Sequence, residues 1–100
     1  MSLSDIKAED RRREILRLLA ADKHETASED MIDRALDAMG MAFRASRAQV
    51  RTDLTWLSEQ GLLKLEDLGG LILATLTQYG HDVASGDAVV PGVSRRPRGR

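Results

Sequence analysis

The sequence contains no cysteine, only three aromatic residues and only two prolines among its 100 residues. The lack of cysteine excludes disulfides, thiolate metal sites and a cysteine nucleophile. Because Phe43, Trp56 and Tyr79 are the only aromatic residues, the core has to consist mostly of Leu, Ile, Val, Ala and Met. No apolar run approaches the roughly 20 residues that span a bilayer, and no signal-peptide pattern opens the chain. We therefore expect a cytoplasmic protein that does not bind a membrane.

The chain also lacks a strong net charge. It contains 15 Lys and Arg and 16 Asp and Glu, which gives a formal net charge of −1. This balance argues against a protein that coats nucleic acid without sequence preference. The charge is unevenly distributed, since the last ten residues contain four arginines and no acid. The length and the hydrophobic content of 42% fit one small globular domain. We expect this domain over residues 1–90 and an extended, flexible basic tail over residues 91–100.

The stretch from Phe43 to Gly61 carries a helix start, an amphipathic body and a helix stop. Ser46 and Gln49 match the S/T-x-x-E/Q capping box, in which each side chain binds the other residue's backbone N–H. Gly61 is a candidate for the left-handed residue that follows a helix. Three apolar residues at the spacing of one helical face predict a buried stripe: Val50, Leu54 and Leu57.

A flank of the same helix, away from this stripe, is cationic. It combines arginines with short side chains: Arg44, Arg47, Ala48, Arg51 and Thr55. Arginines can reach phosphates or the O6/N7 edge of guanine in the major groove, and short neighbours permit close approach. A solvated helix face is the alternative interpretation of three arginines taken alone.

Two more helices are predicted before this one. Residues 4–21 place Ile and Leu on one face and most of their arginines elsewhere. Thr26 and Glu29 form a second capping-box pattern, which predicts the start of the next helix, and Gly40 predicts its end. The outer face of this second helix is acidic and repels phosphate, so it should point away from any bound DNA.

After the third helix the hydrophobic pattern changes from helical to alternating. Residues Asp67–Gly70 have turn chemistry and precede a compact apolar run over residues 71–76, so this region predicts a β-hairpin. A short helix is predicted from Thr77 onward, in which Gly80 lowers helix stability. Residues 89–93 are expected to be extended and to lie across the body of the domain.

Helix, helix, turn, helix, hairpin, helix is the element order of a winged helix-turn-helix domain. The predicted fold class is therefore mainly α with a small β-hairpin. The step out of the hairpin, Leu76-Thr77-x-x-Gly80, is similar to the exit seen in bacterial winged-helix regulators of the ArsR and MarR type.

A more specific resemblance covers about residues 10–97. It is carried mainly by these segments: Gln49-Val50-Arg51, Trp56-Leu57-x-x-Gln60-Gly61-Leu62, Leu68-Gly69-Gly70, Ala74-Thr75-Leu76-Thr77 and Val89-Val90-Pro91-Gly92-Val93. In these segments the chain resembles a family of small winged-helix proteins encoded by Mu-like phages and prophages, which are commonly described as ArsR-like regulators.

This resemblance and the cationic helix together imply a phage or prophage transcriptional regulator that binds double-stranded DNA as a homodimer in the bacterial cytoplasm. The expected DNA contacts lie on the third helix, at the base of the wing and in the tail: Arg44, Arg47, Arg51, Thr55, Lys64, Arg95 and Arg96. Metal sensing of the ArsR type is not expected, because the chain has no cysteine and only His24 and His81 as histidines. No metal or other cofactor is expected.

A second interpretation stays open, in which the chain is a protein-interaction module that serves assembly or packaging of a Mu-like phage. It would use the winged helix to form a homodimer or to bind a phage protein partner. The acidic balance and the presence of Asp67 in a wing tip without Lys or Arg favour this interpretation. An enzyme is not expected, because Ser, His and carboxylates do not gather in a nucleophile or metal motif, so no catalytic residue is predicted.

Overall fold

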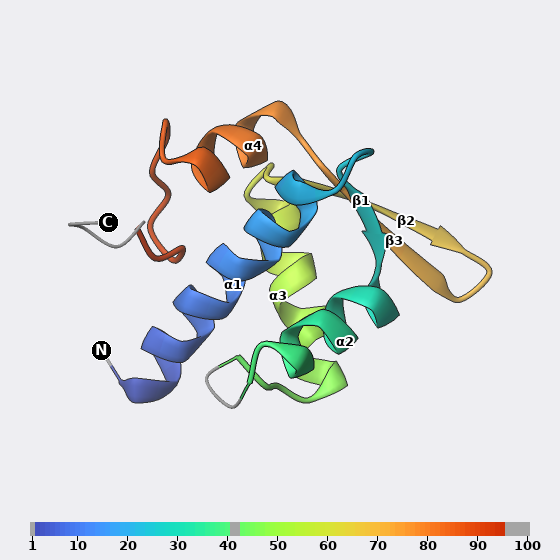
Figure 1. The fold of residues 1–100 in the computed structure, drawn as a ribbon, viewed down its shortest axis with the longest axis horizontal. Helices are drawn as coiled ribbons and strands as arrows, with labels where there is room; N and C mark the ends of the chain where they lie inside the picture. The colour runs from blue at the N-terminus through green and yellow to red at the C-terminus, as the bar shows by residue number, and fades with distance from the viewer. Residues whose placement is uncertain (1, 41–42, 96–100) are drawn as a thin grey trace.

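The structure, a computed structural model, describes residues 2–40 and 43–95. Within these residues the elements follow in this order: α1 (Leu3–Ala21), β1 (Thr26–Ser28), α2 (Glu29–Ala38), α3 (Arg47–Glu59), β2 (Leu63–Leu68), β3 (Leu71–Leu76) and α4 (Gln78–Ser85). Figure 1 shows the helices gathered into one body, from which the β2–β3 hairpin projects at the right. Helices α2 and α3 form the helix-turn-helix and the hairpin forms the wing, as the sequence predicts.

The core lies where α1, α2 and α3 meet the base of the sheet. The predicted stripe of α3 is buried, since Val50, Leu54 and Leu57 are at most 1% exposed. It packs against aliphatic side chains that are equally buried: Ile15, Leu16, Leu19, Ile32, Leu36 and Leu62. Burial of each such side chain contributes about 1.5–3 kcal/mol. This aliphatic cluster fixes which side of α3 faces solvent.

Helix α3 begins and ends where the sequence predicts. The Ser46 hydroxyl accepts the Gln49 N–H at 3.1 Å, and the Gln49 Oε1 accepts the Ser46 N–H at 2.9 Å, which completes the capping box. Gly61 follows the helix with φ +80°, in the left-handed region. Arg44 precedes this helix, so it extends the cationic flank from the connection rather than from the helix itself.

The start of α2 differs from the prediction. Thr26 does not cap the helix, because residues Thr26–Ser28 form strand β1, which pairs antiparallel with β3. Ser28 caps α2 instead, and the Thr26 hydroxyl bonds to the Ala74 carbonyl at 3.0 Å and lies 2.6 Å from the Thr75 hydroxyl. β-Branched residues such as Thr26 are favoured in strands. The partner strand β3 is far away in the sequence, so a local capping pattern cannot reveal this pairing.

The sheet has the order β1-β3-β2, with the wing formed by β2 and β3. Gly69 and Gly70 have φ values of +67° and +96°, as a two-residue type I′ turn requires. The Asp67 Oδ1 accepts the Gly70 N–H at 2.8 Å, so this acid stabilises the turn. The hairpin is confirmed, and β2 extends through Leu68, further than the alternation in the sequence suggests.

Gly80 has a packing role in α4 that helix propensity does not reveal. A Cβ atom at this position would lie 2.1 Å from the carbonyl oxygen of Leu62. The same carbonyl accepts a hydrogen bond from the hydroxyl of Thr77, the N-cap of α4, at 3.0 Å. Gly80 therefore permits close contact between α4 and the start of the wing, and the prediction that it merely weakens the helix is incomplete.

Residues 89–93 pack on the body as predicted, but they are not extended throughout, because the Val93 N–H donates to the Val90 carbonyl at 3.2 Å and Gly92 has φ +99°, which makes a turn. Val90 and Val93 are each only 6% exposed, and the Ser94 N–H donates to the Glu9 carbonyl of α1 at 3.2 Å. Packed residues thus continue past the predicted domain boundary at residue 91. Half of the predicted flexible tail, residues 96–100, lies outside the described residues.

A buried ionic network ties α1, α3 and this C-terminal segment together. Asp53 of α3 is 1% exposed and accepts hydrogen bonds from the Nε atoms of Arg11 and Arg12. The Arg12 guanidinium also donates to the Gly92 carbonyl at 3.0 Å and lies 4.4 Å from the ring centroid of Trp56. Two of the three consecutive arginines in α1 are therefore structural.

Candidate functional site

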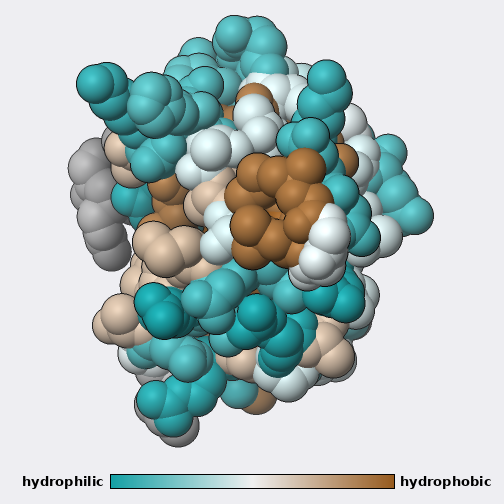
Figure 2. All heavy atoms as spheres, turned by 90° about the vertical axis from the view of Figure 1, so that its right-hand side faces the viewer, coloured by the Kyte–Doolittle hydropathy of each residue, from teal (hydrophilic) through white to brown (hydrophobic). Residues whose placement is uncertain are grey.

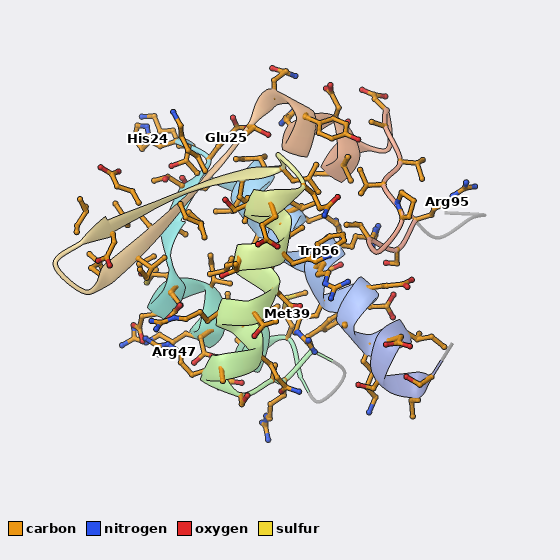
Figure 3. All side chains as sticks on the ribbon, turned by 180° about the vertical axis from the view of Figure 1, so that it is seen from behind. His24, Glu25, Met39, Arg47, Trp56 and Arg95 are labelled. Carbon is orange, nitrogen blue, oxygen red and sulfur yellow. The ribbon has the colours of Figure 1, made fainter. Side chains whose placement is uncertain are left out.

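The arginines predicted to contact DNA from α3 lie together on one side of the domain. The side chains of Arg44, Arg47 and Arg51 are 60%, 52% and 61% exposed, and Thr55 is exposed one turn after Arg51. Figure 3 shows Arg47 at the side of the domain where α2 and α3 meet. Helical spacing therefore places Arg47, Arg51 and Thr55 as expected, and Arg44 joins them from the connection before α3.

Glu29, the first residue of α2, binds two of these arginines. Its carboxylate accepts from the Arg47 Nε at 3.0 Å and, through both oxygens, from the Arg51 Nε at 2.8 Å and Nη2 at 2.9 Å. The hydrogen bond from Arg51 is the main reason why the pKa of Glu29 lies below its ordinary value, although its side chain is only 5% exposed. The bonds to Glu29 raise the pKa of both arginines.

Further carboxylates of α2 surround the same flank. The Arg47 Nη1 lies 3.3 Å from the Asp30 Oδ1 and 3.6 Å from the Asp33 Oδ2, and the Arg44 Nε lies 3.9 Å from the Asp37 Oδ1. The acidic face of α2 therefore lies beside the cationic flank, whereas DNA binding through α3 requires it to point away. The acids of α2 are evident in the sequence, but their pairing with these arginines is not, because it depends on how the two helices pack.

The wing presents carboxylates and leucines where a DNA-binding wing needs cations. Lys64 is exposed near its base, but Glu66 and Asp67 are also exposed and form no ion pair with any residue of 2–40 or 43–95. At the turn, Leu68 is 49% exposed and Leu71 is 48% exposed. Figure 2 shows the hydrophobic patch at this end of the molecule, with hydrophilic side chains below it.

An open groove lies between α3 and the inner face of the wing. It is lined by residues from α2, α3 and both wing strands: Glu29, Arg51, Leu54, Thr55, Leu65, Glu66, Asp67 and Ile72. Its floor is apolar, because it consists of buried Leu54 and half-buried Leu65 and Ile72. The carboxylates of Glu29 and Asp67 and the guanidinium group of Arg51 line the rim, whereas the Glu66 side chain alternates with those of Leu65 and Asp67 and lies on the opposite face of the hairpin. We call this the α3–wing groove.

Of the two tail arginines predicted to contact DNA, Arg95 does not extend this surface. Figure 3 shows Arg95 and Arg47 on opposite sides of the domain. Arg96 lies outside the described residues. The predicted DNA contacts for which the structure gives a position therefore divide between two separate regions.

The part of the chain that the structure describes contains neither a cluster of metal ligands nor a helix that could cross a membrane. Among residues 2–40 and 43–95, no three His, Asp or Glu side chains are close enough to hold a metal ion. In the same part of the chain, every helix is too short or too polar to cross a membrane.

Comparison with known proteins identifies two relatives. Over 97 residues the chain is 46% identical to the uncharacterized protein gp26 of Escherichia phage Mu, which covers 96% of this chain and 98% of gp26. Over 79 residues it is 40% identical to an uncharacterized protein of Haemophilus influenzae, which covers 78% of this chain and 74% of that protein. No family model matches the chain.

Proposed function

The chain belongs to the family of protein gp26 of Escherichia phage Mu, and we propose that its winged helix is a protein-interaction module for assembly or packaging of a Mu-like phage. The observation that carries this proposal is the pairing of every arginine of the α3 flank with a carboxylate of α2. A helix that reads DNA through arginines needs those guanidinium groups for phosphates and base edges.

Electrostatics at this flank oppose the approach of a phosphate. Binding of DNA gains affinity when cationic side chains replace the counterions of phosphates. Here Glu29, Asp30, Asp33 and Asp37 lie within 4 Å of the arginines that would have to do this. A phosphate would meet the attraction of the arginines and the repulsion of the acids together. The net attraction of α3 for DNA is therefore small.

The wing supports a protein partner in place of DNA. Leucine side chains cannot bind phosphate, and two that are half-exposed next to each other at a projecting turn gain free energy when a partner covers them. Leu68 and Leu71 occupy opposite positions in the hairpin register, so they present one contiguous apolar surface. We assign this surface to a phage protein, since the family includes a phage protein.

Site-specific photo-crosslinking tests this function. A benzophenone amino acid replaces Leu71, or replaces Val89 as the control, because Val89 is a similarly exposed apolar residue on another part of the domain. In cells that produce the phage, we expect one phage protein to crosslink from position 71 and not from position 89. Leu68→Ser should abolish that product. Identical products from both positions, or none, would contradict the proposal.

The second candidate is a DNA-binding transcriptional regulator, and one observation favours it. More than half of the surface of each arginine side chain on the α3 flank is exposed, so the outer guanidinium nitrogens are accessible to a large ligand. If these arginines bind DNA, Glu29→Gln should strengthen binding, because it removes the negative charge that competes with phosphate. Arg51→Ala should weaken it and reduce its dependence on salt.

A further inference from the structure

Strand β2 forms one edge of the sheet, because the order β1-β3-β2 gives it a single neighbour. Figure 1 shows that the β2–β3 hairpin projects beyond the helices. Most residues of this strand are exposed to solvent: Lys64, Glu66, Asp67 and Leu68. An exposed edge strand presents a row of backbone N–H and C=O groups to which another strand can pair.

Two hydrogen bonds at the base of the wing show which backbone groups of β2 point to this edge. The Thr77 N–H donates to the Leu62 carbonyl at 3.1 Å, whereas the Leu76 N–H points the other way and donates to the Glu25 carbonyl, just before β1, at 2.9 Å. Backbone groups alternate in direction along an antiparallel pair, so the even-numbered residues of β2 bond to β3 and the odd-numbered ones point away from it. The N–H and C=O groups of Leu65, in the middle of β2, therefore face the open edge.

The side chains of β2 place two opposite charges on one face of the strand. Leu63, Leu65 and Asp67 lie on the face toward α3, and Lys64 and Glu66 lie on the other face, where both are exposed. Neither Lys64 nor Glu66 forms an ion pair with another of the residues that the structure describes. The two charges stand on either side of Leu65 and are free to pair with a second strand.

A second copy of β2 is complementary to this edge in one register. When two identical strands pair antiparallel, a two-fold axis relates them, and the residue at the axis lies opposite its own counterpart. An axis at Lys64, Glu66 or Asp67 would place like charges directly opposite each other, which is destabilising. An axis at Leu65 instead places Lys64 of each copy opposite Glu66 of the other, so both charges find a partner of opposite sign.

We propose that two copies of the chain pair antiparallel through their β2 edges, with the two-fold axis at Leu65. Leu65 exchanges N–H···O=C bonds with its counterpart, because these groups face the open edge, and residues 63 and 67 exchange further bonds in the same way. The two three-stranded sheets then become one continuous sheet. This pairing rests on backbone groups and on two charges rather than on the apolar wing tip, so it holds or fails independently of the proposed contact with a phage protein.

Disulfide trapping reads this register directly, because the chain has no cysteine of its own. Full-length Lys64→Cys protein is mixed with Glu66→Cys protein that carries a size tag, in a glutathione redox buffer. Residues opposite each other in a non-hydrogen-bonded pair have Cα atoms about 4.5 Å apart, which suits a disulfide. We expect the mixed disulfide to form in preference to both symmetrical ones, since the mixed dimer also keeps one Lys64–Glu66 pair.

Asp10→Cys is the matched control for this experiment, because it introduces a cysteine in place of an exposed acid on α1. Mixed with Lys64→Cys, it should give no preference for the mixed disulfide. Equal yields of mixed disulfide with Asp10→Cys and with Glu66→Cys would overturn the proposal. So would a preference for disulfides between two Lys64→Cys copies or between two Glu66→Cys copies, because each indicates a different register.

Exchange of the two charges gives a second measurement on the protein without cysteines. Lys64→Glu alone, or Glu66→Lys alone, places like charges opposite each other and should raise the dissociation constant of the dimer about tenfold or more in sedimentation equilibrium. The double variant restores opposite charges and should return the constant to within about twofold of the wild-type value. A double variant no better than the single ones would contradict the pairing. A wild-type protein that stays monomeric would also overturn the proposal, and would leave the β2 edge to a segment of another protein or to solvent.

Discussion

Gly92→Ala is the substitution that best tests whether the C-terminal segment belongs to the folded domain. Gly92 has φ +99°, and a Cβ atom there would lie 2.6 Å from two ring carbons of Trp56. Gly86 is a matched control, because its φ is +92° and no atom lies within 4 Å of a Cβ at that position. Both substitutions place a non-glycine residue at a positive φ, but only Gly92→Ala also makes the added Cβ overlap with the Trp56 ring.

The magnitude follows from these two contributions. A non-glycine residue in the left-handed region costs about 1–2 kcal/mol, which applies to both variants. The overlap with Trp56 adds about 1–3 kcal/mol for Gly92→Ala alone. A domain of this size has a free energy of unfolding of about 5–15 kcal/mol, so the larger loss is a substantial fraction of it. The melting temperature should fall by about 4–8 °C for each kcal/mol.

Urea denaturation followed by tryptophan fluorescence measures both variants. Trp56 is the only tryptophan, and it reports on the contact that the substitution disturbs. We expect Gly92→Ala to lower the free energy of unfolding by at least about 1 kcal/mol more than Gly86→Ala. Equal losses in the two variants would show that residues 89–94 do not pack against Trp56.

Three other substitutions test the contacts that hold the site. Asp53→Ala removes the buried partner of Arg11 and Arg12 and should lower the free energy of unfolding by about 3–5 kcal/mol, whereas Asp37→Ala on the surface should change it by less than about 1 kcal/mol in the same urea titration. The pKa of Glu29 is depressed in the folded state, so its stabilisation is complete above its ordinary pKa of 4.5 and is lost as the pH falls through the folded value. Unfolding measured from pH 6 to pH 3 should therefore show a smaller loss of stability for Glu29→Gln than for the wild type, and identical pH profiles would contradict this. Gly80→Ala places a methyl group 2.1 Å from the Leu62 carbonyl oxygen and should lower the free energy of unfolding by about 3 kcal/mol, whereas Gly70→Ala, which meets no atom within 4 Å, should lose only about 1–2 kcal/mol.

Features with short-range causes could be predicted from the sequence. The capping box of Ser46 and Gln49, the stop at Gly61 and the turn at Gly69-Gly70 each depend on residues within a few positions of one another. The buried stripe of α3 follows from helical periodicity in the same way. These features were enough to place the helix-turn-helix and the wing, and hence the cationic flank of α3.

Features that depend on distant residues could not be predicted. Thr26 lies in β1 because it pairs with strand β3, almost 50 residues later in the sequence. Glu29 binds Arg47 and Arg51 because α2 and α3 pack at an angle that brings them within 3.0 Å. Gly80 is required by a carbonyl of a different element. Each of these contacts gives a residue a role that differs from the one predicted from its sequence neighbours. The contacts of Glu29 also change the interpretation of the candidate site.

DNA binding by the full-length protein tests most directly whether the carboxylates of α2 neutralise the arginines of the α3 flank. Fluorescence anisotropy at 150 mM NaCl is measured with duplexes that tile the genome encoding the chain, for the wild type and for Arg51→Ala. We predict no dissociation constant tighter than about 10⁻⁵ M for any duplex, in the range of non-specific binding, and no difference between the two proteins. A duplex bound at about 10⁻⁸ M by the wild type and clearly more weakly by Arg51→Ala would contradict the protein-binding function and establish α3 as a recognition helix.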